Sequence, residues 1–126
     1  MTKTIFIAGS GGIGEAAALL LREWCEVETT IILGDVSEGN LIKASEMVRA
    51  NSQKTSAIET VVMSRDGIND AMKVAFERTD VLLDCSPGGQ APRMARFAVD
   101  YKFHYANLTE YVAETDSEWG RELAEN

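Results

Sequence analysis

The chain has 126 residues, of which 20 are acidic and 12 basic, giving a formal net charge of -8. This length suits one domain with its own core, and a composition of 45% hydrophobic and 25% charged residues is ordinary for a globular protein. Because no basic stretch occurs along the sequence, we expect neither nucleic acid nor an anionic membrane as a partner.

The N-terminal residues and the cysteines indicate the cellular compartment in which the protein is expected. The first apolar stretch is interrupted by Gly9 and Gly14 and then by Glu15, so we expect no signal peptide and no membrane span, and a cytoplasmic protein. Cys25 and Cys85 have no CxxC spacing, and the chain has one His. A metal site or a disulfide framework is therefore not expected.

Five apolar runs of strand length occur along the chain. They are continuous rather than alternating, as in strands that are covered on both faces. The runs begin at Thr4, Thr29, Ile58, Asp80 and Phe103.

Segments of helical period separate these runs. The first is Glu15 to Trp24, the second follows Ser37, the third follows Asp66, and the fourth opens at Pro92, whose missing N–H needs no partner in a first turn. Strands that alternate with helices are connected by right-handed crossovers. The sequence therefore predicts an α/β fold, a Rossmann-like parallel sheet of about five strands with helices on both faces.

A glycine cluster lies between the first strand and the first helix. Gly9, Gly11 and Gly14 have the spacing G-x-G-x-x-G, which alone is a weak signal, because glycines are common wherever a strand turns into a helix. Here Asp35 also follows Gly14 by 21 residues, at the end of the second strand, and the whole arrangement is typical of dinucleotide binding. The alternative is a structural turn.

The backbone of this loop is expected to hold the cofactor pyrophosphate. The first glycine permits the turn, the second lets the phosphates approach, and the third lets the helix and strand pack closely. The free N–H groups of the helix N-terminus attract phosphate even in an acidic protein. The expected contacts are Gly9, Ser10, Gly11, Gly12, Ile13 and Gly14.

Asp35 bears on which dinucleotide binds. A carboxylate at this position accepts hydrogen bonds from the adenine-ribose hydroxyls and repels a 2'-phosphate, and the next three residues include no Arg. We therefore expect NAD, with NADP disfavoured, and we expect Asp35 and Val36 to contact it. The alternative is that Asp35 caps the second helix.

Two more loops follow the fourth and fifth strands, at the edge where parallel sheets bind ligands. The fourth strand continues into DCSPGGQAPRMARFA, from Asp84, and the fifth into HYANLTEYV, from His104. We interpret Cys85 as a small apolar residue, since no basic group is placed to lower its pKa. Arg93 and Arg96 are interpreted as solvated helix residues.

These two segments and GSGGIG, in that order, resemble the N-terminal domain of the saccharopine dehydrogenase family, which includes lysine dehydrogenase-like and carboxynorspermidine-forming members. The resemblance covers nearly the whole chain. It implies that the turn after the fourth strand lines the nicotinamide ribose and that the segment after the fifth strand borders the active site. The further cofactor contacts that it implies are Cys85, Ser86, Pro87, Gly88, Leu108 and Thr109.

The resemblance also implies a function and a division of the chain. Family members transfer hydride at a C–N bond of an amino-acid-derived substrate, and NADP-using members tend to carry Ser or Arg where this chain has Asp35 and Val36. We expect residues 1–110 to form the dinucleotide-binding domain and 111–126 to be partly helical, leading to a substrate domain absent from this chain. A terminal helix docked on the sheet is the alternative. If Trp119 is exposed, it would favour a homodimer.

Two functions remain open on the sequence alone. As the cofactor domain of an oxidoreductase, the chain would bind NAD and catalyse little or nothing without its substrate domain, and its catalytic residues are not assigned. As a stand-alone NAD-sensing regulatory domain, it would bind the same cofactor and self-associate. The CSPGGQAPRMARFA segment favours the first, because a sensor needs no turn shaped around a reacting nicotinamide.

Overall fold

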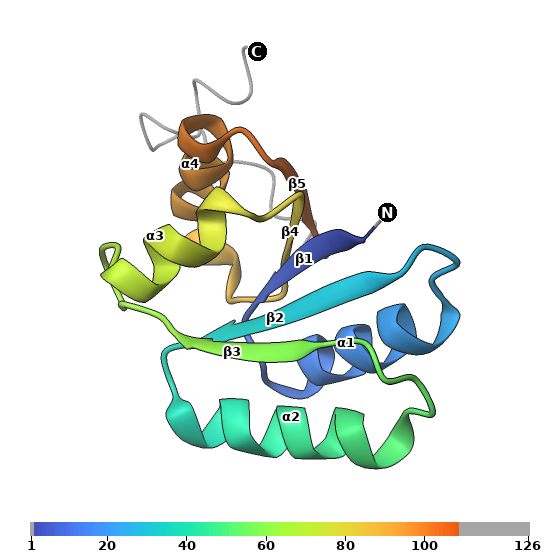
Figure 1. Cartoon of the computed structure of the whole chain (residues 1–126). Coiled ribbons are helices and arrows are strands. Elements are labelled where there is room, and N and C mark those ends of the chain that lie inside the picture. The colour runs from blue at the N-terminus through green and yellow to red at the C-terminus, as the bar shows by residue number, and fades with distance from the viewer. Residues whose placement is uncertain (1, 109–126) are drawn as a thin grey trace.

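The computed structural model describes residues 2–108, which form five strands and four α-helices (Figure 1). The predicted terminal segment 111–126 lies outside the described residues. The strands are β1 (Lys3–Ala8), β2 (Thr29–Asp35), β3 (Ile58–Val62), β4 (Val81–Asp84) and β5 (His104–Asn107). The helices are α1 (Gly12–Trp24), α2 (Glu38–Asn51), α3 (Asp70–Glu77) and α4 (Ala91–Tyr101), with a 3-10 turn, η1 (Gly88–Gln90), before α4.

The strands form one parallel sheet in the order β3-β2-β1-β4-β5. The chain first winds outward from β1 to β3, then crosses to β4 and winds the other way, so the strand order reverses between β1 and β4. In sheets of this kind the reversal opens a crevice at the carboxyl ends of the strands. The predicted Rossmann-like α/β fold is confirmed, and none of the described helices has the length and hydropathy to cross a membrane.

Helices cover the two faces of the sheet as separate layers (Figure 1). Successive β1 side chains point to opposite faces, so Ile5 and Ile7 pack with α1 and α2, whereas Phe6 and Ala8 pack with α3 and α4. This placement explains why the strands read as continuous apolar runs, since both faces are buried.

Phe76 lies at the centre of the α3/α4 layer. Its ring is fully buried, and its centroid lies between 5.0 and 5.5 Å from those of Phe6, Phe97, Tyr101 and Phe103. Tilted aromatic pairs at such distances add to the free energy of burial. This cluster joins β1, α3 and α4 on the side of the sheet that carries the loops after β3 and β4.

The predicted helix starts need two corrections. The first helix begins at Gly12 rather than Glu15, and the third begins at Asp70 rather than after Asp66. Asn69 sets the later start, because its Oδ1 accepts a hydrogen bond from the Met72 N–H (2.9 Å) and caps the helix. The residues after β3 therefore form a loop, and not a first helical turn.

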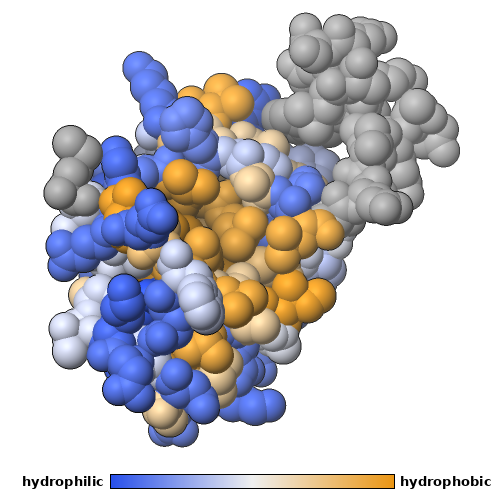
Figure 2. Space-filling view, turned by 90° about the vertical axis from the view of Figure 1, so that its right-hand side faces the viewer, coloured by the Kyte–Doolittle hydropathy of each residue, from blue (hydrophilic) through white to orange (hydrophobic). Residues whose placement is uncertain are grey.

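Hydrophobic side chains also gather on one side of the molecule, which Figure 2 shows. α1 exposes Ile13, Leu20 and Trp24, whose spacing of seven and four residues places them on one helix face. On the same layer Leu83 and Cys85 are only partly buried. Exposed apolar areas of this kind are typical of contact surfaces.

We expect Phe76→Ala to lower the free energy of unfolding by about 3–5 kcal/mol, because the substitution leaves a cavity among four rings. Urea denaturation followed by circular dichroism measures the change. Val74→Ala on the same helix, 63% exposed, is the control and should change stability by less than about 0.5 kcal/mol. Equal effects of the two substitutions would contradict this account of the core.

Candidate functional site

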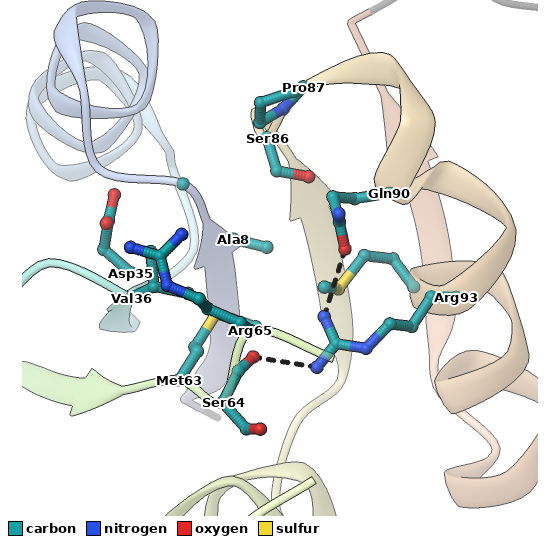
Figure 3. Close-up of a pocket in the computed structure, with 12 residues that line it drawn as sticks. Ala8, Asp35, Val36, Met63, Ser64, Arg65, Ser86, Pro87, Gln90 and Arg93 are labelled. Atoms are coloured by element: carbon teal, nitrogen blue, oxygen red, sulfur yellow. Dashed lines mark hydrogen bonds between the residues drawn. The ribbon is translucent and has the colours of Figure 1, made fainter. Parts of the chain in front are cut away.

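A cleft of about 320 Å³ opens at the carboxyl ends of the strands (Figure 3). It lies where the strand order reverses, with the ends of β1, β2 and β3 on one side and the β4 turn and α4 on the other. The lining residues are Ala8, Gly9, Asp35, Val36, Met63, Ser64, Arg65, Ser86, Pro87, Gln90, Arg93 and Met94.

The glycine turn brings α1 close to the end of β1. Gly9 has a positive φ of 91°, and a Cβ there would come within 2.8 Å of the Ser86 nitrogen. A Cβ on Gly14 would lie 1.8 Å from the Gly9 carbonyl oxygen. Both positions therefore require glycine for the fold itself.

The middle of the same turn is open. A Cβ on Gly11 or Gly12 would meet nothing within 4 Å, and both residues are exposed. Gly11 is the N-cap of α1 and provides no side-chain hydrogen bond, so the first-turn N–H groups face outward without a capping side chain. An open backbone at a helix N-terminus fits a pyrophosphate.

Asp35 joins the glycine turn to the start of α2. Its Oδ2 accepts from the Ser10 N–H (2.7 Å) and its Oδ1 from the Ser37 N–H (2.8 Å), and the residue is only 9% exposed. Ser37 itself caps α2, with its Oγ accepting from the Asn40 N–H (3.2 Å). The carboxylate thus holds two loops in place, and the alternative that Asp35 is the helix cap is wrong.

The β4 turn depends on a buried carboxylate that the sequence analysis did not single out. Asp84 Oδ1 accepts from the Ser86 N–H (3.0 Å) and from the Ser86 hydroxyl, and its Oδ2 accepts from the Tyr105 hydroxyl (2.7 Å). Burial raises the pKa of the Tyr105 phenol, so it stays protonated and remains a donor to Asp84. These bonds fix the turn that carries Ser86 and Pro87 into the cleft.

Cys85 lies in this turn but not in the lining of the cleft. It packs partly buried against the α1/α2 layer. Burial, and secondarily the charge of Asp84, raises the pKa of its thiol to about 11, so the thiol is protonated at neutral pH. The interpretation of Cys85 as a small apolar residue agrees with this placement.

Only some of the predicted cofactor-binding residues line the cleft. Gly9, Asp35, Val36, Ser86 and Pro87 line it together. The remaining predicted residues lie elsewhere: Ser10 is buried under the turn, Gly11, Gly12 and Ile13 are exposed on it, Gly14 is buried behind it, Gly88 begins η1, Leu108 is exposed after β5, and Thr109 lies outside the described residues.

Residues that follow β3 and residues around the start of α4 also line the cleft, although they were not predicted. Met63, Ser64 and Arg65 follow β3 directly and line the cleft, so the rule that the carboxyl ends of parallel strands share one edge would have found them. Arg93 is not the solvated residue that was expected. Its guanidinium donates to the carbonyl oxygens of Ser64 (2.9 Å) and Gly67 and lies 5.3 Å from the centroid of the Phe97 ring.

The turn, the open helix N-terminus and the cleft at the strand reversal define a dinucleotide-binding α/β domain. Comparison with family models agrees, because the model described as the saccharopine dehydrogenase NADP binding domain matches residues 5–125. The chain therefore belongs to this family. Within residues 2–108, no group of three or more His, Cys, Asp or Glu side chains could hold a metal ion.

Solved structures show the same fold. The chain is similar to the apo histidine-tagged saccharopine dehydrogenase (L-Glu forming) from Saccharomyces cerevisiae, with a TM-score of 0.65 and 16% sequence identity. The match covers 96% of this chain but only 24% of the yeast protein, so the chain spans about a quarter of that length. A comparison with curated proteins gives no match.

The predicted preference for NAD over NADP is wrong, since the matched family model is that of an NADP-binding domain. The prediction treated Asp35 as a free acceptor for ribose hydroxyls. In the structure each of its oxygens accepts a backbone N–H group, so the carboxylate has a structural role that does not depend on the nucleotide. The lack of Arg in the residues after β2 was also too narrow a criterion, because Arg65 reaches the same cleft from β3.

We expect Gly14→Ala to lower the free energy of unfolding by at least about 2 kcal/mol, because the added methyl would overlap the Gly9 carbonyl oxygen. Gly12→Ala, two residues away with open space around it, should stay within about 1 kcal/mol of the parent. Thermal and urea unfolding measure both. A Gly14→Ala protein as stable as Gly12→Ala would show that α1 does not need this close approach.

Proposed function

We propose that this chain is the NADP-binding domain of a dehydrogenase that transfers hydride at the C–N bond of an amino-acid-derived substrate. The observation that carries the proposal is the glycine turn, in which Gly9 and Gly14 are fixed by packing while Gly11 and Gly12 leave the backbone open. The family assignment supports a dehydrogenase rather than a regulatory module.

The residues present fit a dinucleotide phosphate. The first-turn N–H groups of α1 and the exposed Gly11 and Gly12 offer donors and space for the pyrophosphate. On either side, the cleft offers the β2 and β3 ends to the adenosine half and the β4 turn to the nicotinamide half. When bound, the cofactor would donate or accept the hydride, and the described residues would bind and orient it.

The substrate side of the proposal rests on the family. The yeast relative is a saccharopine dehydrogenase, and this chain spans about a quarter of it. Recognition of the substrate therefore falls to polypeptide beyond the cofactor domain, and this chain alone should bind cofactor without turnover. The free thiols of Cys25 and Cys85 favour a reducing compartment and so support a cytoplasmic location.

Calorimetric titration tests the cofactor role. We expect NADPH to bind in the micromolar range and Gly11→Val to weaken binding at least about 10-fold, because the new side chain would fill the space left for the pyrophosphate. The chain should still fold, since that space is empty and replacing the glycine N-cap costs only about 1 kcal/mol. Ala50→Val, at the exposed far end of α2, is the control and should bind as the parent does.

Two outcomes would contradict this proposal. The first is a parent chain that is folded but binds neither NADPH nor NADH at millimolar concentration. The second is a Gly11→Val chain that binds NADPH as tightly as the parent, which would make the glycine turn only a structural connection.

A further inference from the structure

Arg65 is the one basic residue that lines the cleft without a partner among residues 2–108. It follows β3 by three positions and is exposed, and its guanidinium forms no hydrogen bond or ion pair within the described part of the chain. Figure 3 shows its side chain extending toward the side of the cleft that holds Asp35 and Val36. A guanidinium placed in this way has five free donors.

The position of Arg65 follows from the register of the sheet. Asp35 of β2 pairs with Val62 of β3, and the Met63 N–H donates to the Asp35 carbonyl oxygen (2.8 Å). The residues that follow Met63 therefore leave the sheet beside the end of β2. In a sheet of this topology the adenine ribose lies at that strand end, so the loop after β3 lies beside it.

The loop that carries Arg65 is held on both sides. The Asn69 side-chain amide donates to the Val62 carbonyl (2.9 Å), and the Gly67 N–H donates to the Ser64 hydroxyl (3.2 Å). From α4, Arg93 donates to the carbonyls of Ser64 and Gly67. The main chain on each side of Arg65 is thus fixed, while its side chain is free to bind.

Arg93 is held in turn by α4. Its Nη1 donates to Gln90 Oε1 (3.2 Å), which Figure 3 draws with the bond to Ser64, and it lies over the Phe97 ring. Burial lowers its pKa, with Asp66 acting in the opposite direction. Its Nε is buried without a partner in the described residues. The Arg93 guanidinium is thus partly removed from water and donates hydrogen bonds to the loop after β3.

We propose that Arg65 binds the 2'-phosphate of NADP and that Arg93 is a positioning residue that holds the Arg65 loop against α4. This inference rests on the proposed function of the cleft. It assigns recognition of the phosphate to the loop after β3, since a planar guanidinium can form two parallel hydrogen bonds to phosphate. The positive charge of Arg65 would attract a phosphate bound beside Asp35 and so counter the repulsion from the Asp35 carboxylate.

The test is calorimetric titration of the folded parent, Arg65→Gln and Lys73→Gln with NADPH and NADH. We expect the parent to prefer NADPH, and Arg65→Gln to weaken NADPH binding about 10- to 100-fold while NADH binding stays nearly constant, because only NADPH carries the 2'-phosphate. Lys73→Gln removes the same charge from exposed α3 and should bind both as the parent does. Added salt should reduce the NADPH preference of the parent.

The outcomes separate this inference from the proposed function. A parent that prefers NADPH while Arg65→Gln keeps the full preference overturns the role of Arg65 and leaves the cofactor role standing. A parent that binds both nucleotides equally does the same. A parent that binds neither overturns both proposals.

The positioning role of Arg93 has its own test. Arg93→Lys keeps the charge but cannot hold the separate acceptors of the loop and Gln90 at once, so the preference for NADPH should fall while NADH binding is retained. In an Arg65→Gln background the same substitution should change the preference no further. An equal loss of affinity for both nucleotides, or a further fall in NADPH preference in the Arg65→Gln background, would contradict the positioning role. The Arg65→Gln test does not depend on whether the Arg93→Lys protein folds.

Discussion

The contact between the Gly14 backbone and the Gly9 carbonyl oxygen is the constraint on which the site depends. A Cβ at Gly14 would lie 1.8 Å from that oxygen, so α1 begins directly above the end of β1. This closeness points the N-terminus of the helix at the crevice between β1 and β4, where the strand order reverses. It also separates two kinds of glycine within six residues, those that the fold requires and those that leave room for a ligand.

Asp35 shows how a motif residue can be located correctly while the nucleotide preference inferred from it is wrong. The spacing from Gly14 located it correctly at the end of β2, but spacing carries no information about which atoms its carboxylate meets. Two backbone N–H groups, from Ser10 and Ser37, donate one hydrogen bond to each carboxylate oxygen and tie the glycine turn to α2. Because this structural role does not depend on the nucleotide, the presence of Asp35 alone does not select NAD.

Periodicity was sufficient for the fold and for part of the site. Continuous apolar runs gave the five strands, and the rule of right-handed crossovers gave the two helix layers, because burial on both faces leaves a direct trace in sequence. The β3 loop was not predicted because the third helix was expected directly after Asp66, whereas the Asn69 cap delays the start of α3 until Asp70. The role of Arg93 was not predicted because its acceptors are main-chain carbonyls 26 and 29 residues away, and no local sequence pattern indicates such contacts.

The contacts of α4 hold one wall of the cleft in place. The aromatic cluster around Phe76 fixes α4 against β1 and α3, and Arg93 extends that packing to the loop after β3. On the other side of the cleft, Asp84 and Tyr105 fix the β4 turn with buried hydrogen bonds. Both walls are therefore held by groups that no ligand needs to touch, whereas Arg65 and the open glycines keep unused hydrogen-bonding capacity. In a folded protein such capacity is satisfied by water or by a ligand, and we propose that the phosphates of a dinucleotide satisfy it here.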